Sequence, residues 1–301
     1  MSMAVTKRSQ MPPNVRHDEL MSAHTSWRVG GPADLFFKPA AVVELAQFLR
    51  ELPPDLPVHW IGLGSNTLVR DGGIRGAVIC TTDLERAIER IDPKRVRVTA
   101  GVPCTAFARQ CVRYKLGPAA FFAGIPGSLG GALAMNAGAF GGATWDHLEQ
   151  VETIDRRGEL RARARDAYEI GYRSVCGPAE EWFVAATFHF ELDEGAQLSD
   201  ISQMVKQRGN TQPIGQPSCG SVFKNPPGNF AGRLIEAAGL KGARIGGAVV
   251  STKHANFILN DRQARAADIE ALIEHIRATV RERSGVELEL EVRVIGMEQK
   301  P

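Results

Sequence analysis

Residues 121–141 read FFAGIPGSLGGALAMNAGAFG, a run dominated by glycine and alanine. Such small residues let a backbone approach a flat or charged group closely, although each glycine weakens a helix by up to ~1 kcal/mol. We expect a helix to begin near Ser128 as its cap, so that the backbone N–H groups of residues 127–131 form a nest for a pyrophosphate. The alternative is a close-packed helix crossing that needs no ligand.

A second glycine-containing stretch, GLGSNT, spans residues 62–67 and follows a predicted buried strand at residues 57–63. It lacks the third glycine and the following helix that a Rossmann dinucleotide site requires. On its own it is also typical of a simple turn. Because neither stretch continues into a Walker-type Gly-Lys-Ser/Thr, the pair predicts a long dinucleotide between two lobes, and FAD fits that description.

Composition excludes several classes of protein. The 301 residues carry a formal net charge of +2, which gives no strong basic field for nucleic-acid binding. The five cysteines form no C-x-x-C pair and are odd in number, so we expect reduced thiols. We find no signal peptide and no stretch of the ~20 apolar residues that a membrane helix needs. We therefore expect a cytoplasmic globular protein.

The length of 301 residues suggests two or three domains, and hydrophobic periodicity predicts both strands and helices. Strands are expected at 33–37, 57–63, 77–81, 96–100, 151–155, 182–192 and 286–295. Helices are expected at 42–49, 105–116, 198–208, 231–238 and 266–283. We assign residues 1–17 to a flexible leader, 18–82 and 83–194 to two lobes, and 195–301 to a third domain, whose last strand is a candidate to return to the first lobe.

The chain resembles a known enzyme family in motifs spread over nearly its whole length. Besides the two stretches above, these are HTSWRVGGPA (24–33), QPSCGSVFKNP (216–226), STKHANFI (251–258) and LELEVR (288–293). In this order they are similar to motifs of the UDP-N-acetylenolpyruvoylglucosamine reductases. The resemblance implies an α+β fold, with a two-lobed FAD-binding domain of the vanillyl-alcohol-oxidase type and a C-terminal α+β substrate-binding domain.

Two residues and one connection depart from the usual family pattern. His24 stands where the family usually has Asn, and Cys219 where Ala is common. Both are local changes that leave the flavin assignment intact. The short connection 174–181 indicates the family's shorter form, which lacks an inserted loop whose Tyr closes over the substrate.

The resemblance also implies the reaction and its catalytic residues. NADPH reduces FAD, whose N5 passes a hydride to C3 of the enolpyruvyl ether of UDP-N-acetylglucosamine-enolpyruvate. Protonation at C2 then yields UDP-N-acetylmuramate for peptidoglycan precursor synthesis. Because charge develops on the substrate carboxylate, a fixed cation and a positioned acid are needed. By matched position these are Arg173 as the cation, Ser221 as the proton donor and Glu291 as a second acid, although each residue by itself is typical of a turn or an exposed strand.

The remaining site residues follow from the two glycine-containing stretches and from the family motifs. Expected cofactor-binding residues are Gly62, Gly64, Ser65, Asn66, Thr67, Leu68, Gly124, Ile125, Pro126, Gly127, Ser128, Gly130, Gly131, Asn136, Ala137 and Gly138. Expected substrate-binding residues are Tyr172, Arg208, Lys224, Asn225 and Lys253. No metal site is expected, because His254 has no second His or Cys at ligand spacing beside it, and we interpret it as a structural hydrogen-bonding residue.

Two other functions stay open at this point. An FAD-dependent alcohol oxidase of the same fold would return electrons to oxygen, whereas a nucleotide-sugar binding module would hold only UDP. A yellow preparation that oxidises NADPH in response to the enolpyruvyl sugar nucleotide favours the reductase over both. The expected partners are therefore that substrate and NADPH, with no nucleic acid and no membrane, and we expect a monomer.

Overall fold

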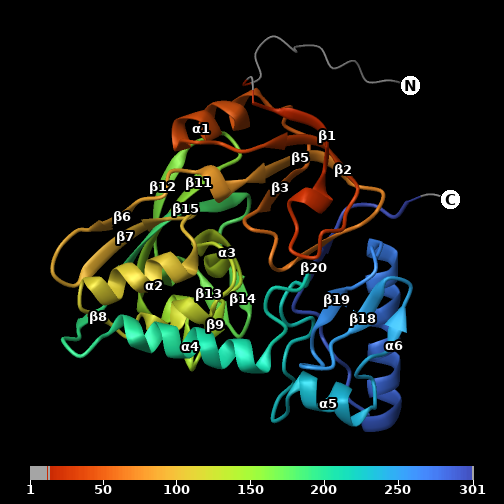
Figure 1. Ribbon diagram of the computed structural model, residues 1–301. Coiled ribbons are helices and arrows are strands. Elements are labelled where there is room, and N and C mark those ends of the chain that lie inside the picture. Colours follow the sequence, from red (N-terminus) through yellow and green to blue (C-terminus); the bar gives the residue numbers. More distant parts are fainter. Residues whose placement is uncertain (1–11, 13, 300–301) are drawn as a thin grey trace. The chain divides into compact units, whose positions relative to one another are not determined.

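The computed structural model describes residue 12 and residues 14–299 (Figure 1). Most of the expected leader, residues 1–11 and 13, lies outside the described residues, and strand β1 (Arg16–Leu20) begins within the stretch assigned to it. The chain forms two compact units, each assembled from separate segments. The first unit extends to Asp18 and adds Asp34–Gly62 and Gly76–Ala196, and the second unit comprises Glu19–Ala33, Leu63–Arg75 and Gln197 onward.

A four-stranded sheet, with the strand order β1-β2-β5-β3, contributes its larger part to the first unit. Its other strands are β2 (Pro32–Phe37), β5 (Ile74–Cys80) and β3 (Val58–Ile61), and β3 runs parallel to β5. Helix α1 (Val42–Glu51) buries Leu45, Phe48 and Leu49 in one hydrophobic cluster with Phe37 and Ile79 of this sheet. The apolar spacing that predicted this helix therefore packs it on the sheet.

An antiparallel five-stranded sheet forms the rest of the first unit's framework, in the order β12-β11-β15-β7-β6. The strands are β12 (Leu160–Ala164), β11 (Leu148–Asp155), β15 (Glu181–His189), β7 (Arg95–Thr99) and β6 (Ile88–Arg90). Helices α2 (Cys104–Arg113) and α3 (Leu129–Ala134) lie beside it (Figure 1). The ring of Phe107 on α2 lies 5.0 Å from that of Phe122 and 5.1 Å from that of Phe188, so aromatic packing joins helix and sheet.

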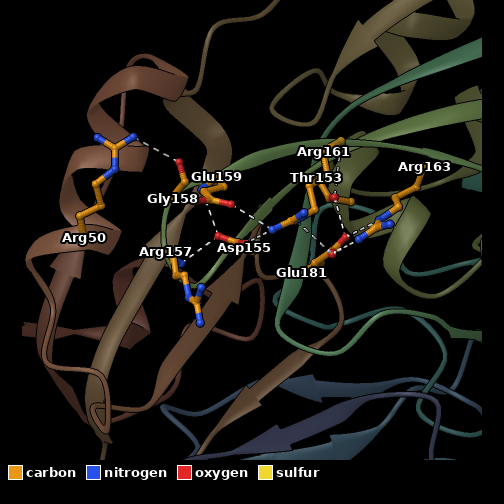
Figure 2. A network of polar contacts seen from close by, with 9 residues as sticks. All are labelled: Arg50, Thr153, Asp155, Arg157, Gly158, Glu159, Arg161, Arg163 and Glu181. Carbon is orange, nitrogen blue, oxygen red and sulfur yellow. Dashed lines mark hydrogen bonds and ion pairs between the residues drawn. The ribbon is translucent and has the colours of Figure 1, made fainter.

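Polar side chains join strands β11, β12 and β15 on one face of this sheet (Figure 2). Glu181 accepts hydrogen bonds from Thr153 Oγ1 at 2.8 Å and from Arg163 Nη2 at 2.5 Å. Arg161 donates to Asp155 and Glu159 at the adjoining hairpin. The Arg163 guanidinium beside Glu181 holds the pKa of that carboxyl below its ordinary value of 4.5, so Glu181 is charged at neutral pH.

Short strand pairs complete the first unit, and 3₁₀ turns lie in both units. The pairs are β8 (Leu116–Gly117) with β16 (Glu191–Leu192), β9 (Gly138–Ala139) with β10 (Gly142–Ala143), and β13 (Glu169–Gly171) with β14 (Ser174–Cys176). The 3₁₀ turns are η1 (Met21–Ala23), η2 (Thr81–Asp83), η3 (Ala120–Gly124), η4 (Thr144–His147) and η5 (Arg165–Ala167).

The second unit contains a three-stranded antiparallel sheet, β17 (Arg244–Ile245), β18 (Ala248–Val250) and β19 (Ile258–Asn260), and strands β18 and β19 share one hydrophobic cluster with the helices at 231–237 and 266–284. Its helices are α4 (Leu198–Thr211), α5 (Ala231–Ala237) and α6 (Ala266–Ser284). Strand β20 (Arg293–Ile295) pairs in parallel with β4 (Thr67–Val69). Trp27 Nε1 donates to the carbonyl of Ile258 at 2.7 Å, which fixes this early segment in the second unit.

The predicted helices are confirmed, and two of them end at the expected glycines. Gly285 follows α6 with a φ of 70°, and Gly239 follows α5 with a φ of 72°, the left-handed geometry that glycine adopts without strain. Helix α6 is the longest of the described helices, and among the described residues no helix is both long and apolar enough to cross a bilayer.

Two strand predictions were too long. The strand expected at 286–295 is regular only in β20, because the N–H groups of Glu291 and Val292 share the carbonyl of Val222, at 2.8 and 3.3 Å, and so do not continue a ladder. Burial still alternates there, since Leu288 and Val292 are buried and Glu287 and Glu289 are exposed. The strand expected at 182–192 divides into β15 and β16.

Candidate active site

Ser128 lies in the first unit and carries a buried hydroxyl. It is the N-cap residue of α3, as predicted, but its side chain makes no capping bond. The residue is only 2% exposed, and its Oγ has no hydrogen-bond partner among the residues that the structure describes. A Cβ placed on Gly62 would lie 2.4 Å from this Oγ, so the glycine keeps the space beside the hydroxyl open. Because buried polar atoms are normally bonded, the pair indicates a place for a polar ligand.

The glycines of the 121–141 stretch divide into two groups. A Cβ on Gly124 would lie 2.6 Å from the Ala139 Cβ, and one on Gly138 would lie 2.6 Å from the Gly142 carbonyl, so the protein's own packing requires these glycines. A Cβ on Gly131 would meet no other described atom within 4 Å. Close packing, the alternative raised by the sequence, therefore explains part of the stretch, and open space remains at Gly131.

The predicted phosphate nest is partly occupied by the protein itself. The N–H groups of Leu129 and Gly130 donate to the carbonyls of Val102 and Ala100, each at 2.9 Å. Two of the N–H groups expected to face a pyrophosphate are thus bonded within the first unit.

Arg173 is anchored to the same glycine-rich stretch. It occupies the tip of the β13–β14 hairpin with a φ of 53°, which is uncommon for a residue other than glycine. Its guanidinium donates to the carbonyls of Asn136 at 3.4 Å and Gly138 at 3.1 Å. The neighbouring Tyr172 is exposed, with its ring centroid 5.5 Å from Arg173 Cζ. The fold thus fixes the direction of the Arg173 guanidinium, which is permanently charged and which these two hydrogen bonds join to neutral carbonyls.

A pocket of about 560 Å³ lies within the second unit. Three of the predicted site residues line it together, namely Ser221, Asn225 and Lys253. Arg233 and His254 also line it, and sequence reasoning assigned neither to a ligand. Arg233 lies on α5 in no motif that suggested binding, and only the packing of α5 near the 251–256 segment brings it to the pocket. The volume of this pocket lies within the range of small-molecule binding sites.

The charge of this pocket comes from Arg233 and Lys253, opposed by Glu236. His254 adds a neutral ring, because burial, and then the nearby Lys241, lowers its pKa below the ordinary value of 6.5. Its Nδ1 accepts the Asn256 N–H at 3.3 Å and its ring lies 4.9 Å from that of Phe257, as expected for a structural hydrogen-bonding residue. A cationic pocket with neutral donors suits an anionic ligand.

Hydrogen bonds to main-chain carbonyls bring Glu291 and the 64–67 loop close to the segment of Ser221. The Glu291 N–H donates to the carbonyl of Val222, the residue after Ser221, at 2.8 Å. Asn66 Nδ2 donates to the Glu291 carbonyl at 3.0 Å, and the thiol of Cys219 donates to the Gly64 carbonyl at 3.3 Å. Residues predicted for the reaction and for the cofactor therefore adjoin within the second unit.

The other predicted residues are distributed as follows. Lys224 lies 3.5 Å from a Glu289 carboxylate oxygen and Arg208 donates to Gln212 at 2.7 Å, and neither is among the residues lining the pocket. Leu68, Ile125 and Ala137 are buried, and the N–H groups of Ile125 and Ala137 donate to the carbonyls of Phe122 and Ala132. Ser65, Thr67, Pro126 and Gly127 remain predicted cofactor residues. Among the described residues no group of three or more His, Cys, Asp or Glu could hold a metal ion.

Comparisons with known proteins match two parts of the chain to family models. Residues 33–162 match the family described as FAD binding domain, and residues 212–295 match the UDP-N-acetylenolpyruvoylglucosamine reductase C-terminal domain. The chain is 54% identical to the UDP-N-acetylenolpyruvoylglucosamine reductase of Alkalilimnicola ehrlichii over 99% of both chains. It belongs to the UDP-N-acetylenolpyruvoylglucosamine reductase family. It is also 55% identical to the reductase of Methylococcus capsulatus, over 93% of both chains.

A solved reductase of this family, from Thermus caldophilus, has a similar structure. The TM-score is 0.78 at 33% identity, over 93% of this chain and 99% of that chain. The predicted family and α+β fold class are confirmed, as is an FAD-dependent oxidoreductase as the class of enzyme. The lone Ser128 hydroxyl beside Gly62, together with the open space at Gly131, fits a large polar cofactor such as FAD.

Proposed function

We propose that this enzyme uses NADPH to reduce the enolpyruvyl ether of UDP-N-acetylglucosamine-enolpyruvate to UDP-N-acetylmuramate, a step of peptidoglycan precursor synthesis. The observation that carries the proposal is the pocket that Ser221, Asn225 and Lys253 line together. A hydroxyl acid beside a cationic, nucleotide-sized pocket is what protonation of a UDP-linked substrate requires. We further propose that the enzyme works as a monomer in the cytoplasm.

Arg173 is proposed to receive the substrate carboxylate. Its guanidinium is always charged and can grip two oxygens at once, so it stabilises the negative charge that develops on the carboxylate during reduction. Hydrogen bonds to the Asn136 and Gly138 carbonyls fix its direction before substrate arrives. Pre-oriented charge of this kind stabilises a transition state without a cost of reorganisation. Tyr172, next to it at the hairpin tip, is proposed to contact the substrate.

Ser221 is proposed to donate the proton to C2, with Glu291 as the second acid. A serine hydroxyl is a weak acid, so its conjugate base needs nearby positive charge, and Lys253 lines the same pocket. The bond from the Glu291 N–H to the Val222 carbonyl keeps the segment of Glu291 beside the Ser221 loop, which supports this role. Bound FAD would supply the hydride for C3, and the proton from Ser221 would complete the reduction at C2.

The pocket itself is proposed to hold the UDP diphosphate. Arg233 and Lys253 supply charge for phosphate oxygens, and Asn225 supplies neutral hydrogen bonds. Lys224 and Arg208 remain proposed contacts from the sequence. On the cofactor side, Ser128 and the backbone around Gly62 and Gly131 are proposed to hold FAD, since these positions leave a bonding group and space for it.

Stopped-flow kinetics of the two half-reactions test this proposal. Ser221→Ala should leave flavin reduction by NADPH nearly unchanged and slow reoxidation by the enolpyruvyl substrate by roughly 10²-fold or more, the usual contribution of a general acid. Ser218→Ala is the matched control, because Ser218 lies in the same loop but is not among the pocket-lining residues. It should change neither step.

The outcomes separate the function from the residue's role. A wild-type enzyme whose reduced flavin is not reoxidised by the enolpyruvyl sugar nucleotide would contradict the proposed reaction. If wild type reacts and Ser221→Ala slows both half-reactions equally, the reaction stands and Ser221 is not the acid. Reoxidation by oxygen with an alcohol, without use of NADPH, would indicate the oxidase alternative.

A further inference from the structure

Asn136 joins three segments of the first unit. It follows α3 with a φ of 46°, a left-handed conformation that asparagine tolerates better than most residues. Its Nδ2 donates to the Gly171 carbonyl in β13 at 3.1 Å, and its Oδ1 accepts the Trp145 N–H at 3.1 Å. Its own carbonyl accepts from Arg173 at 3.4 Å. One residue therefore ties the end of α3 to η4 and to the hairpin that carries Arg173.

The hairpin tip needs such support. Gly171 pairs with Ser174, so Tyr172 and Arg173 form a two-residue turn. The positive φ of Arg173 is a strained conformation for a residue with a side chain, and strain of this kind persists only where the surroundings hold it. The bond from Asn136 Nδ2 reaches Gly171 at the base of this turn, and the bonds to the Asn136 and Gly138 carbonyls hold its tip.

We propose that Asn136 is a positioning residue for Arg173. Its side-chain amide sets the hairpin, and through it the guanidinium, in the direction that receives a carboxylate. The inference rests on the proposed function, because it assumes that Arg173 binds the carboxylate of the substrate. It concerns a role that acts through Arg173, and it is separate from the cofactor contact that the sequence predicts for Asn136.

Asn136→Asp tests the amide with little change of shape. Aspartate keeps the tolerance for a positive φ and can still accept the Trp145 N–H, but it has no donor for the Gly171 carbonyl and places negative charge against it. Asn136→Gly is the second variant, because it removes the side chain while keeping the backbone unstrained. Asn14→Asp is the matched control, since Asn14 Nδ2 also donates to a backbone carbonyl, that of Lys38 at 3.4 Å, at an exposed position.

The readout is the binding of two ligands to the FAD-loaded enzyme, UDP-N-acetylmuramate, which carries a carboxylate, and UDP-N-acetylglucosamine, which does not. Asn136→Asp and Asn136→Gly should weaken binding of the first ligand by up to roughly 10-fold, the upper end of what one intramolecular hydrogen bond contributes. Binding of the second ligand should change by less than about twofold. Asn14→Asp should leave both unchanged.

A double-mutant cycle shows whether Asn136 acts through Arg173. In an Arg173→Lys background, Asn136→Asp should cause no further loss of UDP-N-acetylmuramate binding, because residues in one network are not additive. Independent additive losses, or equal weakening of both ligands, would overturn the inference. Loss of FAD binding in Asn136→Asp would also overturn it in favour of a cofactor role. If wild type itself fails to reduce the enolpyruvyl sugar nucleotide, it is the proposed function that falls.

Discussion

Replacing Ser128 by Ala should stabilise the protein without FAD and weaken its affinity for FAD. The two effects, on stability and on FAD affinity, have opposite signs for one reason. Ser128 is only 2% exposed, and its Oγ has no hydrogen-bond partner among the described residues. In the protein alone, the unbonded buried hydroxyl is a cost. When FAD is bound, we expect the same hydroxyl to donate to it.

The magnitudes follow from the cost of burying polar groups. An unsatisfied buried polar group costs about 1–3 kcal/mol, so removing this one should raise the unfolding free energy of the FAD-free protein by about 1 kcal/mol or more. A hydrogen bond to a charged group contributes about 1.5–3 kcal/mol. Its loss should raise the dissociation constant of FAD by roughly 10- to 150-fold.

Urea unfolding of the FAD-free protein and FAD titration followed by flavin fluorescence measure the two effects. Thr25→Val is the control, because the buried Thr25 hydroxyl is already bonded to the Val29 carbonyl at 2.8 Å. It should lower stability by about 1–3 kcal/mol. A Ser128→Ala protein that binds FAD as tightly as wild type, or that is less stable without FAD, would refute the reasoning.

Two further predictions concern stability. Glu181→Gln should lower the unfolding free energy by about 1 kcal/mol at pH 7, because it breaks charged hydrogen bonds to a side chain that is 7% exposed. Bonding to Arg163 lowers the Glu181 pKa, so this contribution to stability is present above pH 4.5 and disappears as the pH falls through the pKa of Glu181 in the folded protein. The unfolding free energies of the variant and wild type, measured by urea titration, should therefore converge in acid. A difference between them that stays constant with pH would contradict this. Gly64→Ala should cost at least about 2 kcal/mol, because its φ is 63° and its Cβ would lie 2.2 Å from the His24 carbonyl. Gly215→Ala, with a φ of 86° but no other described atom within 4 Å of the added Cβ, should cost only about 1 kcal/mol, and equal thermal shifts for the two variants would show that the close contact at Gly64 is unimportant.

Local pattern predicted the individual elements well. The spacing of Leu45, Phe48 and Leu49 was enough for α1, and the glycine after α6 was enough for its end, because both signals act within a few residues. The predicted strand at 286–295 failed for the opposite reason. Its alternating burial is real, but whether a strand forms depends on a partner, and two N–H groups here share the single carbonyl of Val222.

The site divides in the same way. Motifs and composition identified the glycine-rich stretches and the family, and they gave Ser221, Asn225 and Lys253 as site residues, which the structure then placed in the lining of one pocket. The sequence could not find Arg233, since a lone arginine on a helix is typical of a solvent-exposed face, and it could not show that Gly124 and Gly138 serve internal packing while Gly131 faces open space.

The sequence by itself therefore determined the types of element, the chemistry available and the family of the enzyme. Only the tertiary structure decided which distant segments share a unit. Trp27 bonds to Ile258 and Asn66 bonds to Glu291, contacts that span more than half of the chain. Such contacts arise when distant segments pack into a common core. The local sequence around either residue has no periodic pattern that predicts them, so only the folded protein shows them.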